Sequence, residues 1–336
     1  MSKKSFFDHS DEFDHAVEKP YRTRQILEWV FSKYVFDFSL MTDLPLPLRQ
    51  KLASEWDIIP LTELSRQQSK EDGTVKFLFQ AGDHILTESV LMTSRERRTL
   101  CVSTQAGCRN GCRFCATGAM GFQRDLTAGE IIGQILYASP LTNIVFMGMG
   151  EPLDNFDSLT SVLHLLNDSD KMNFGARRVT ISTVGIPDKI RELANQNRQF
   201  GLSWSLHAPD DELRSFLMPI NKAYPIRKVM NAFKYYKKTT GGNLTVEYIL
   251  IKGVNDSSSA ALKTAGIALE IGAKVNLIPY NPHPYADFYR SEKETIELFS
   301  DILQKEGVIT TLRESKGKDI DAACGQLAGR HTKEVL

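Results

Sequence analysis

Cys108, Cys112 and Cys115 lie within eight residues of one another, in the spacing C-x-x-x-C-x-x-C. Three thiolates this close together indicate a metal site, and a four-iron cubane held by three cysteines leaves one iron open to activate a small molecule. Structural zinc normally takes four protein ligands, and no second C-x-x-C or Cys/His pair lies nearby. Cysteines buried only for packing have no reason to cluster in a Gly-flanked, Arg-bearing loop. The spacing therefore predicts a catalytic 4Fe-4S cluster.

An open iron suits S-adenosylmethionine (SAM), whose amino and carboxylate groups can chelate it while an electron from the cluster cleaves the sulfonium bond to an adenosyl radical. The run Gly148-Met-Gly-Glu-Pro152 fits one end of this ligand, because its glycines allow close backbone approach and Glu151 can accept from an ammonium group. Alone, such a run equally indicates a tight turn. Neutral hydrogen-bonding groups for the rest of the ligand follow other predicted strands, at Ser182, Ser205, His207 and Asn281.

Two cysteines remain outside the cluster motif, Cys101 and Cys324. Each could be a small buried residue with no chemical role. Cys324, however, stands between Ala and Gly in a stretch with little side-chain bulk. Such a stretch suits a thiol on a mobile loop, which is a nucleophile when ionised.

From residue 98 onward, short apolar or β-branched runs alternate with helical patterns at a period of about thirty residues, which is typical of βα units around a parallel sheet. The six expected strands are Leu100–Ser103, Asn143–Met147, Arg178–Ser182, Leu202–Leu206, Leu244–Ile251 and Val275–Tyr280. The helical patterns cover Thr127–Tyr137, Phe156–Leu166, Ile186–Ala194, Ile226–Tyr236, Ala260–Ile271 and Lys293–Gln304. The fold class is therefore α/β, with a partial (βα)6 barrel. Loops at the carboxyl ends of such strands share one mouth, so the motifs above should converge there.

Three units are expected along the chain. Residues 1–60 read as a small helical domain, and residues 61–97 alternate as strands that form a β extension between this domain and the barrel. The barrel with a C-terminal cysteine loop then covers residues 98–336. No stretch approaches the roughly 20 apolar residues of a membrane span, and no signal peptide is visible, so we expect a cytoplasmic protein. The odd count of five cysteines agrees with a reducing compartment.

Acidic and basic residues balance at 41 each, so net charge gives no indication of nucleic acid. Locally, the segment Lys222–Lys238 carries six basic residues and no acidic one. It could hold RNA, or it could simply be a solvated helix face.

Taken together, the motifs resemble a known family. The cluster loop and the runs FMGMGEP, RRVTIST, SLHAP, LMPINKAYPI, VNLIPYNPHP and DIDAACGQLAG occur in the order seen in the radical SAM RNA methyltransferase family of RlmN, with Cfr as a close relative. The match extends from about Tyr21 to Arg330. The resemblance implies methylation at C2 of an adenine in the peptidyl transferase centre of 23S rRNA and, in some members, of the adenosine 3′ to the anticodon in tRNA.

The same resemblance implies a role for every cysteine, with Cys108, Cys112 and Cys115 on the cluster. Cys324 takes a methyl group from one SAM, a second SAM supplies the radical that removes a hydrogen from it, and the resulting methylene adds to the base. Cys101 resolves the covalent adduct by forming a disulfide with Cys324, and Glu88 is the candidate proton acceptor. The implied SAM contacts are Gly150, Glu151, Ser182, Ser205, Leu206, His207 and Asn281.

Two other functions compete with this one. A Cfr-type enzyme would methylate adenine C8, although Pro152 after Glu151 is similar to RlmN, since Cfr members tend to have Ala there. A non-catalytic, zinc-bearing RNA-binding protein would need a fourth ligand and would have no use for Cys324. The expected partners are 23S rRNA before full ribosome assembly, tRNA, and a reductase or flavodoxin-type electron donor, and the expected state is a monomer.

Overall fold

A computed structural model describes residues 3–313 and 315–327 of the chain. The outermost ends of the predicted 1–60 and 98–336 units, and the end of the family resemblance at Arg330, lie outside the described residues. The division into three units stays a prediction, whereas the elements within it can be compared with the structure directly.

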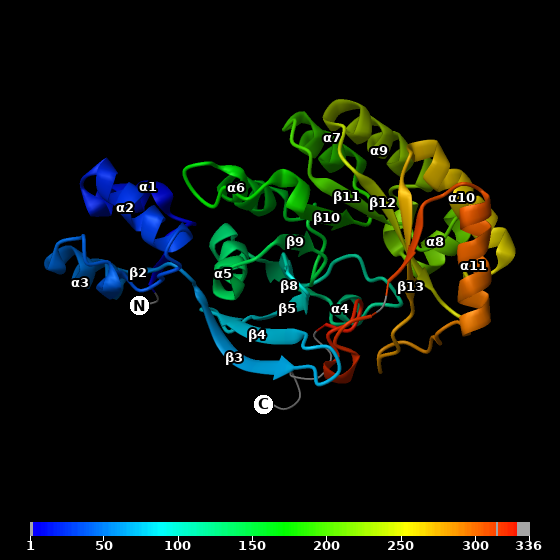
Figure 1. The fold of residues 1–336 in the computed structure, drawn as a ribbon, viewed down its shortest axis with the longest axis horizontal. Helices are drawn as coiled ribbons and strands as arrows, with labels where there is room; N and C mark the ends of the chain where they lie inside the picture. Colours follow the sequence, from blue (N-terminus) through cyan, green and yellow to red (C-terminus); the bar gives the residue numbers. More distant parts are fainter. Residues whose placement is uncertain (1–2, 314, 328–336) are drawn as a thin grey trace.

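One open ten-stranded sheet organises the molecule, in the order β14-β13-β12-β11-β10-β9-β6-β5-β4-β3 (Figure 1). Its parallel part confirms the expected α/β partial barrel. The six expected barrel strands are all present, as β6 (Arg97–Cys101), β9 (Asn143–Phe146), β10 (Val179–Thr183), β11 (Gly201–Ser205), β12 (Leu244–Leu250) and β13 (Lys274–Pro279). The sequence did not reveal β14 (Thr310–Leu312), a three-residue strand parallel to β13 at the edge of the sheet.

Helices follow the barrel strands and cover the outer face of the sheet (Figure 1). They are α5 (Ala128–Ala138), α6 (Phe156–Asn167), α7 (Pro187–Asn195), α8 (Asp211–Leu217), α9 (Ile226–Thr240), α10 (Ser258–Ile271) and α11 (Lys293–Lys305), with the 3-10 turns η2 (Ala176–Arg178) and η3 (Pro219–Lys222). The predicted capping box begins α5, where the Thr127 side chain accepts from the Glu130 N–H and Glu130 accepts from the Thr127 N–H. The amphipathic patterns therefore located six of these helices correctly.

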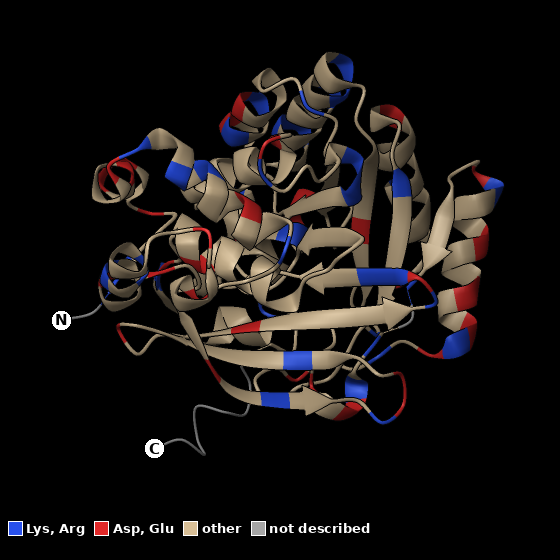
Figure 2. Ribbon diagram, turned by 60° about the vertical axis from the view of Figure 1, so that its left-hand side comes forward, with Lys and Arg blue, Asp and Glu red and all other residues tan. Residues whose placement is uncertain are grey.

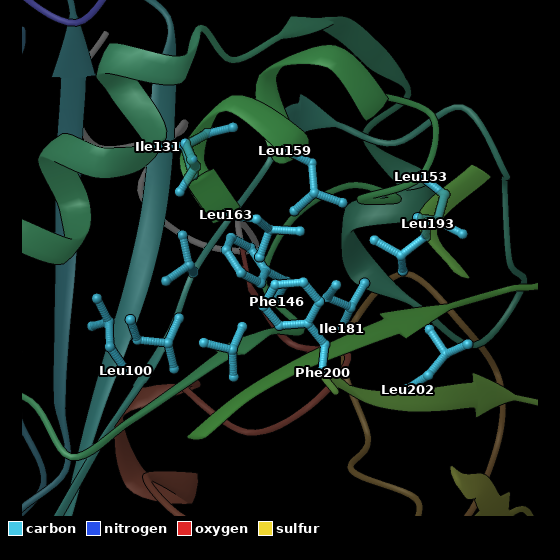
Figure 3. Packing of buried hydrophobic residues seen from close by; sticks show 14 of the residues in the cluster. Leu100, Ile131, Phe146, Leu153, Leu159, Leu163, Ile181, Leu193, Phe200 and Leu202 are labelled. Carbon is cyan, nitrogen blue, oxygen red and sulfur yellow. The ribbon is translucent and has the colours of Figure 1, made fainter. Parts of the chain in front are cut away.

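The core between the sheet and its helices fixes where the strands end. Figure 3 shows Leu159 and Leu163 of α6 gathered around Phe146 of β9 and Ile181 of β10. All four side chains are fully or almost fully buried, and burying each contributes roughly 1.5–3 kcal/mol. This packing holds the carboxyl ends of β9 and β10, and therefore the loops that follow them, in one place.

The β extension is continuous with the barrel sheet. Its antiparallel strands are β3 (Leu61–Gln68), β4 (Val75–Ala81) and β5 (Leu86–Ser94), and β5 pairs with β6, so that Val90 lies opposite Cys101. These strands widen the barrel sheet on one side, and their role as a bridge between two units stays a prediction. The extension thereby forms part of the wall beside Cys101.

The N-terminal segment is mostly helical, as expected, and contains β1 (Lys4–Ser5), α1 (Ser10–Val17), α2 (Pro20–Phe31), η1 (Phe38–Leu40), α3 (Leu46–Glu55) and β2 (Trp56–Asp57). Its own small core stacks Phe13 edge-on against Trp56 at 5.0 Å. Asp8 joins this segment to the barrel, because its carboxylate accepts from the Gly129 N–H (2.7 Å) and the Thr127 hydroxyl (2.8 Å). Among the described residues, no helix is long and apolar enough to cross a membrane.

Candidate active site

Two adjoining cavities lie at the carboxyl ends of the barrel strands. The first, here the cluster cavity, is lined by Cys108, Cys112, Cys115, Gly148, Gly150, Glu151, Ser182, Ser205, His207, Glu247 and Arg313, among others. The second, here the thiol cavity, is lined by Cys101 and Cys324 together with Val90, Met92, Ala322 and Leu327. The two share a wall that includes Cys115, Gly148, Arg313 and Cys324. The predicted cluster ligands and most of the predicted SAM contacts therefore gather in one cavity.

Three predicted residues line neither of these two cavities. Leu206 is buried, and its carbonyl accepts from Arg214 Nε at 3.1 Å. Asn281 donates from Nδ2 to the carbonyl of Cys324 at 3.3 Å, so it contacts the cysteine loop. Glu88 is 2% exposed, and its carboxylate lies 3.5 Å from Lys76 Nζ. Their predicted roles stay predictions, with Asn281 now placed against the chain that carries Cys324.

The strand β7 (Gln105–Gly107) leads into the cluster loop, and α4 (Ala116–Ala119) follows its third cysteine. The next strand, β8 (Phe122–Asp125), pairs back with β7 and so closes the loop at its base. Distant segments hold its remainder. The Arg113 N–H donates to the Leu217 carbonyl (3.0 Å), the Ala116 N–H donates to the Gly325 carbonyl (2.8 Å), and the ring of His283 bonds the Phe114 carbonyl (2.9 Å). These contacts hold the loop that carries the three cysteines in place.

Gly107 is the tightest point of this loop, and replacing it should damage the fold locally. It has φ +76°, and an added Cβ would stand 1.9 Å from the Gly121 carbonyl oxygen. Gly107→Ala should lower the free energy of unfolding by roughly 3 kcal/mol or more, from backbone strain plus a clash. Gly111→Ala is the matched control, because Gly111 also has positive φ (+57°) but open space around it; strain alone costs about 1 kcal/mol. Urea unfolding of both variants measures the difference, and equal losses would contradict the clash.

The three cluster-loop thiols are held in a low-dielectric environment. Burial raises the pKa of Cys108 to about 12, and burial together with the neighbouring thiolates raises the pKa of Cys112 and Cys115. Three thiolates without a cation would be strongly disfavoured here, whereas bound iron deprotonates a coordinating thiol. In the described part of the chain, no three His, Cys, Asp or Glu side chains converge on a single-ion site. A cubane places its ligands differently, since each thiolate binds its own iron, and this donor set fits it.

The Gly148–Pro152 run approaches the barrel wall very closely. An added Cβ at Gly150, which has φ +95°, would stand 2.4 Å from Gln105 Cβ. The carboxylate of Glu151 is buried and accepts from the N–H of Val184 at 2.8 Å and of Leu153 at 3.1 Å. Burial raises the pKa of Glu151 to about 7. The glycines thus bring backbone to the cavity surface, and Glu151 retains lone pairs for an ammonium group.

His207 presents a defined tautomer to the cluster cavity. Its Nδ1 accepts from the Ile249 N–H at 3.1 Å, so the ring proton stands on Nε2. Burial lowers the pKa of His207 to about 3, which keeps the ring neutral at pH 7. Across the cavity, the hydroxyls of Ser182 and Ser205 lie 3.3 Å apart. This edge of the site therefore offers uncharged donors and acceptors, as the sequence predicted.

The buried neutral His207 should make the fold acid-sensitive. Its folded-state pKa lies below the ordinary value of 6.5, so between pH 6.5 and about 3 the unfolded chain binds a proton that the folded chain does not. Stability is therefore lost as pH falls through this window, by up to about 1.4 kcal/mol per pH unit. His207→Asn should remove this contribution, since Asn tolerates the positive φ and offers a similar acceptor. Urea unfolding from pH 7 to pH 5 checks it; parallel pH profiles for both proteins would refute it.

Cys101 and Cys324 meet in the thiol cavity, both as free thiols. Burial raises the pKa of Cys101 to about 12, with a further increase from the nearby Cys324 thiolate. Arg313 is a partly buried cation that lines the same cavity, and the Cys324 thiolate is the main cause of the raised pKa of Arg313. The two cysteines that the sequence separates by more than 200 positions thus line the same small space.

The β extension and the cluster loop together hold the Cys324 loop. Asp72 accepts from the Gly317 N–H (2.9 Å), and Asp319 accepts from the Lys70 N–H (2.9 Å). On the other side, the Thr117 hydroxyl donates to the Leu327 carbonyl (3.2 Å). Figure 1 shows this C-terminal segment between α4 and the turn that joins β3 to β4. The extension therefore positions the cysteine loop over the barrel mouth.

Sequence reasoning missed three charged residues of the site: Arg214 and Glu247, which are buried, and Arg313, which is partly buried. Arg214 is fully buried and donates to the carbonyls of Leu206, Val184 and Ser205, so it ties together the loops after β10 and β11. Burial lowers its pKa to about 10, which still leaves it cationic at pH 7. A charged residue in a core-facing position of a short helix was the available signal.

Three of the six basic residues in the segment Lys222–Lys238 have local partners. In α9, Arg227 and Lys234 both pair with Glu270 of α10, and Lys237 donates to the Gly272 carbonyl. Figure 2 shows basic and acidic residues interspersed over the ribbon. These contacts favour the interpretation as a solvated helix face.

Comparisons with known proteins agree with this geometry. The model of the Radical SAM superfamily matches residues 102–265, and that of the Ribosomal RNA large subunit methyltransferase N-terminal domain matches residues 9–58. The "Probable dual-specificity RNA methyltransferase RlmN" of Geobacillus thermodenitrificans is 45% identical over 325 residues, which cover 94% of this chain and 89% of the relative. This chain belongs to the RlmN family.

Further relatives of the RlmN family agree. The "Dual-specificity RNA methyltransferase RlmN" of Nautilia profundicola is 42% identical over 348 residues, with 97% of this chain and 98% of the relative covered. The crystal structure of a radical SAM methyltransferase from Sphaerobacter thermophilus superposes with a TM-score of 0.92 at 43% identity, covering 96% of this chain and 98% of that one. The chain is therefore a radical SAM methyltransferase, and a family of this kind implies SAM and a 4Fe-4S cluster. A non-catalytic zinc-bearing module does not agree with this membership.

Proposed function

We propose that this RlmN-family enzyme methylates C2 of a specific adenosine in the peptidyl transferase centre of 23S rRNA, and the adenosine 3′ to the anticodon in tRNA. The observation that carries the proposal is the position of Cys101 and Cys324 in one cavity, which shares a wall with the cavity of the three cluster-loop cysteines. Adenine C2 is an electron-poor carbon, so it cannot act as a nucleophile toward the sulfonium methyl group of SAM. A carbon radical must add to it instead. The relatives are named dual-specificity RNA methyltransferases, which supports both RNA substrates.

The cluster cavity holds the residues that would bind the cofactors. Cys108, Cys112 and Cys115 would hold the 4Fe-4S cluster, and Glu151 would accept from the SAM ammonium group. Together the bound cluster and SAM supply an adenosyl radical, and two SAM molecules are used per turnover. Ser182, Ser205 and the Nε2–H of His207 orient the rest of the ligand without adding charge, and the backbone of Gly150 lies at the cavity surface.

The thiol cavity holds the residues that carry the methyl group. The Cys324 sulfur accepts a methyl from one SAM, and after loss of one hydrogen its methylene carbon bonds to C2 of the base. The adduct is a radical, so it gives up one electron, for which the oxidised cluster would be the acceptor, and Glu88 takes the C2 proton. The Cys101 sulfur then forms a disulfide with Cys324 as the carbon–sulfur bond breaks, the freed carbon takes a proton to complete the methyl group, and the methylated RNA leaves. Burial raises the pKa of Cys101, so this thiol needs a proton acceptor before it can attack as a thiolate.

RNA should contact the cavity rim rather than α9, because the target base must leave its stack to enter the mouth. Arg113 is exposed on the cluster loop and stacks over Phe216, which is 45% exposed, at 4.4 Å. Arg113→Gln should weaken RNA binding and reduce the slope of log affinity against log salt by about 1. Lys238→Gln on α9 is the matched control and should leave the slope unchanged. A salt titration of RNA binding tests this, and equal slopes for Arg113→Gln and wild type would contradict it.

The test of the proposed function is mass spectrometry of 23S rRNA and tRNA from a strain that lacks this gene. The account expects 2-methyladenosine to disappear from both RNAs and to return when the gene is restored. Loss of 8-methyladenosine instead would establish the Cfr-type alternative. Loss from rRNA alone would remove tRNA from the proposal. We further propose that the enzyme works in the cytoplasm as a monomer on rRNA that is not fully assembled, with a flavodoxin-type protein as electron donor.

A further inference from the structure

Glu247 is a buried carboxylate on the wall of the cluster cavity that none of the assignments above uses. It lies on β12, directly between Ser205 of β11 and Asn276 of β13. The residue is only 3% exposed, yet it contributes to the cavity lining. Its Oε1 accepts from Asn276 Nδ2 at 3.1 Å, whereas its Oε2 is buried without a hydrogen-bond partner.

The carboxylate is fixed in this position by its neighbours. Asn276 is itself held by the Thr311 hydroxyl, which donates to Asn276 Oδ1, so the amide that anchors Oε1 cannot turn freely. Burial raises the pKa of Glu247, whereas the charge of Arg313 and the side chains of Asn276 and Ser203 favour its ionised form. Buried polar atoms are nearly always paired, so an unpaired carboxylate oxygen on a cavity wall indicates an acceptor that a ligand completes.

We infer that Glu247 Oε2 accepts a hydrogen bond from a ribose hydroxyl of SAM. The inference rests on the proposed function and adds to it a residue that positions the cofactor. A ribose hydroxyl is a neutral donor that carboxylates commonly bind in nucleotide sites. The ammonium group of SAM has Glu151, which lines the same cavity but follows β9, three strands away from β12 in the sheet. The target base is the less suitable donor, because Glu247 lines the cluster cavity and not the thiol cavity where Cys101 and Cys324 meet.

The inference can be tested by equilibrium dialysis of SAM and its 2′-deoxy and 3′-deoxy analogues against cluster-loaded enzyme. Glu247→Gln keeps an oxygen for Asn276 but replaces the Oε2 acceptor with an amide donor. The variant should bind SAM roughly tenfold to a hundredfold more weakly than wild type. For one of the two analogues, wild type and variant should bind equally, because the hydroxyl that distinguishes them is missing. Glu130→Gln, another buried carboxylate outside both cavities, should leave SAM affinity within about twofold.

The outcomes separate this inference from the proposed function. Unchanged SAM affinity in Glu247→Gln, or an equal loss for SAM and both analogues, would overturn the ribose contact while the methyltransferase stands. A variant that binds SAM normally but loses affinity for RNA would transfer Glu247 to the target nucleoside and overturn the inference as stated. Wild-type enzyme that binds no SAM would overturn the proposed function itself, and the inference with it.

Discussion

Replacing Cys101 with alanine should yield an enzyme that purifies with RNA covalently bound to Cys324. In the proposed sequence, Cys324 can still accept a methyl group and its methylene can still add to the base, because neither step uses Cys101. Only the sulfur that breaks the adduct is missing. Cys101 is 7% exposed and lies against Val90 on a central strand, so the shorter alanine side chain fits the same place. Its loss should cost about 1 kcal/mol of stability and leave the fold intact.

Electrophoresis and peptide mass spectrometry of the purified variant would detect the adduct. The crosslinked peptide should contain Cys324, and the crosslink should vanish in the Cys101→Ala, Cys324→Ala double variant. A Cys101→Ala enzyme that carries no RNA and methylates normally would show that Cys101 has only a packing role. That result would leave the cluster assignment unaffected.

Cys324→Ala should abolish methylation, by roughly a thousandfold or more, while iron content and SAM affinity stay at the wild-type level. Cys324 belongs to the wall that both cavities share, and it is separate from the three cluster-loop thiols. Its loop carbonyls still bond Asn281 and Ala116 in the variant, so the site keeps its shape. Anaerobic purification, iron and sulfide analysis and an RNA methylation assay measure these quantities.

Cys112→Ala supplies the opposite pattern as a control. It removes a cluster ligand, so iron content, the brown colour and SAM cleavage should all be lost together. Residual methylation by Cys324→Ala would exclude Cys324 as the methyl carrier. Zinc in place of iron in the wild-type protein would instead contradict the cluster.

Much of the barrel could be predicted because its strands are short runs rich in apolar and β-branched residues, of which Leu244–Leu250 is the clearest. The edge strand Thr310–Leu312 could not, since it has only three residues and is partly exposed. The antiparallel strands at residues 61–94 were visible, but their union with the barrel depends on the pairing of Val90 with Cys101, which no local pattern encodes.

The chemistry was predictable where residue types cluster in the sequence, as in the cluster loop. It was not predictable where a site depends on distant segments. Arg214 donates to carbonyls from two different strand ends, and Glu247 has a carboxylate oxygen that lacks a hydrogen-bond partner. Both arrangements arise only when the chain folds. For the basic face of α9, the sequence run suggested RNA binding, whereas in the structure Arg227 and Lys234 of this face pair with Glu270 of α10.

The most direct test of methyl transfer through Cys324 uses SAM with a trideuterated methyl group. In the proposed route one hydrogen leaves the Cys324 methyl before the carbon reaches the base, and the released product regains one from solvent-exchangeable protons. Mass spectrometry of the RNA nucleosides should therefore find 2-methyladenosine with two deuterium atoms in its methyl group. A methyl group that keeps all three would mean direct transfer from SAM and would contradict the account.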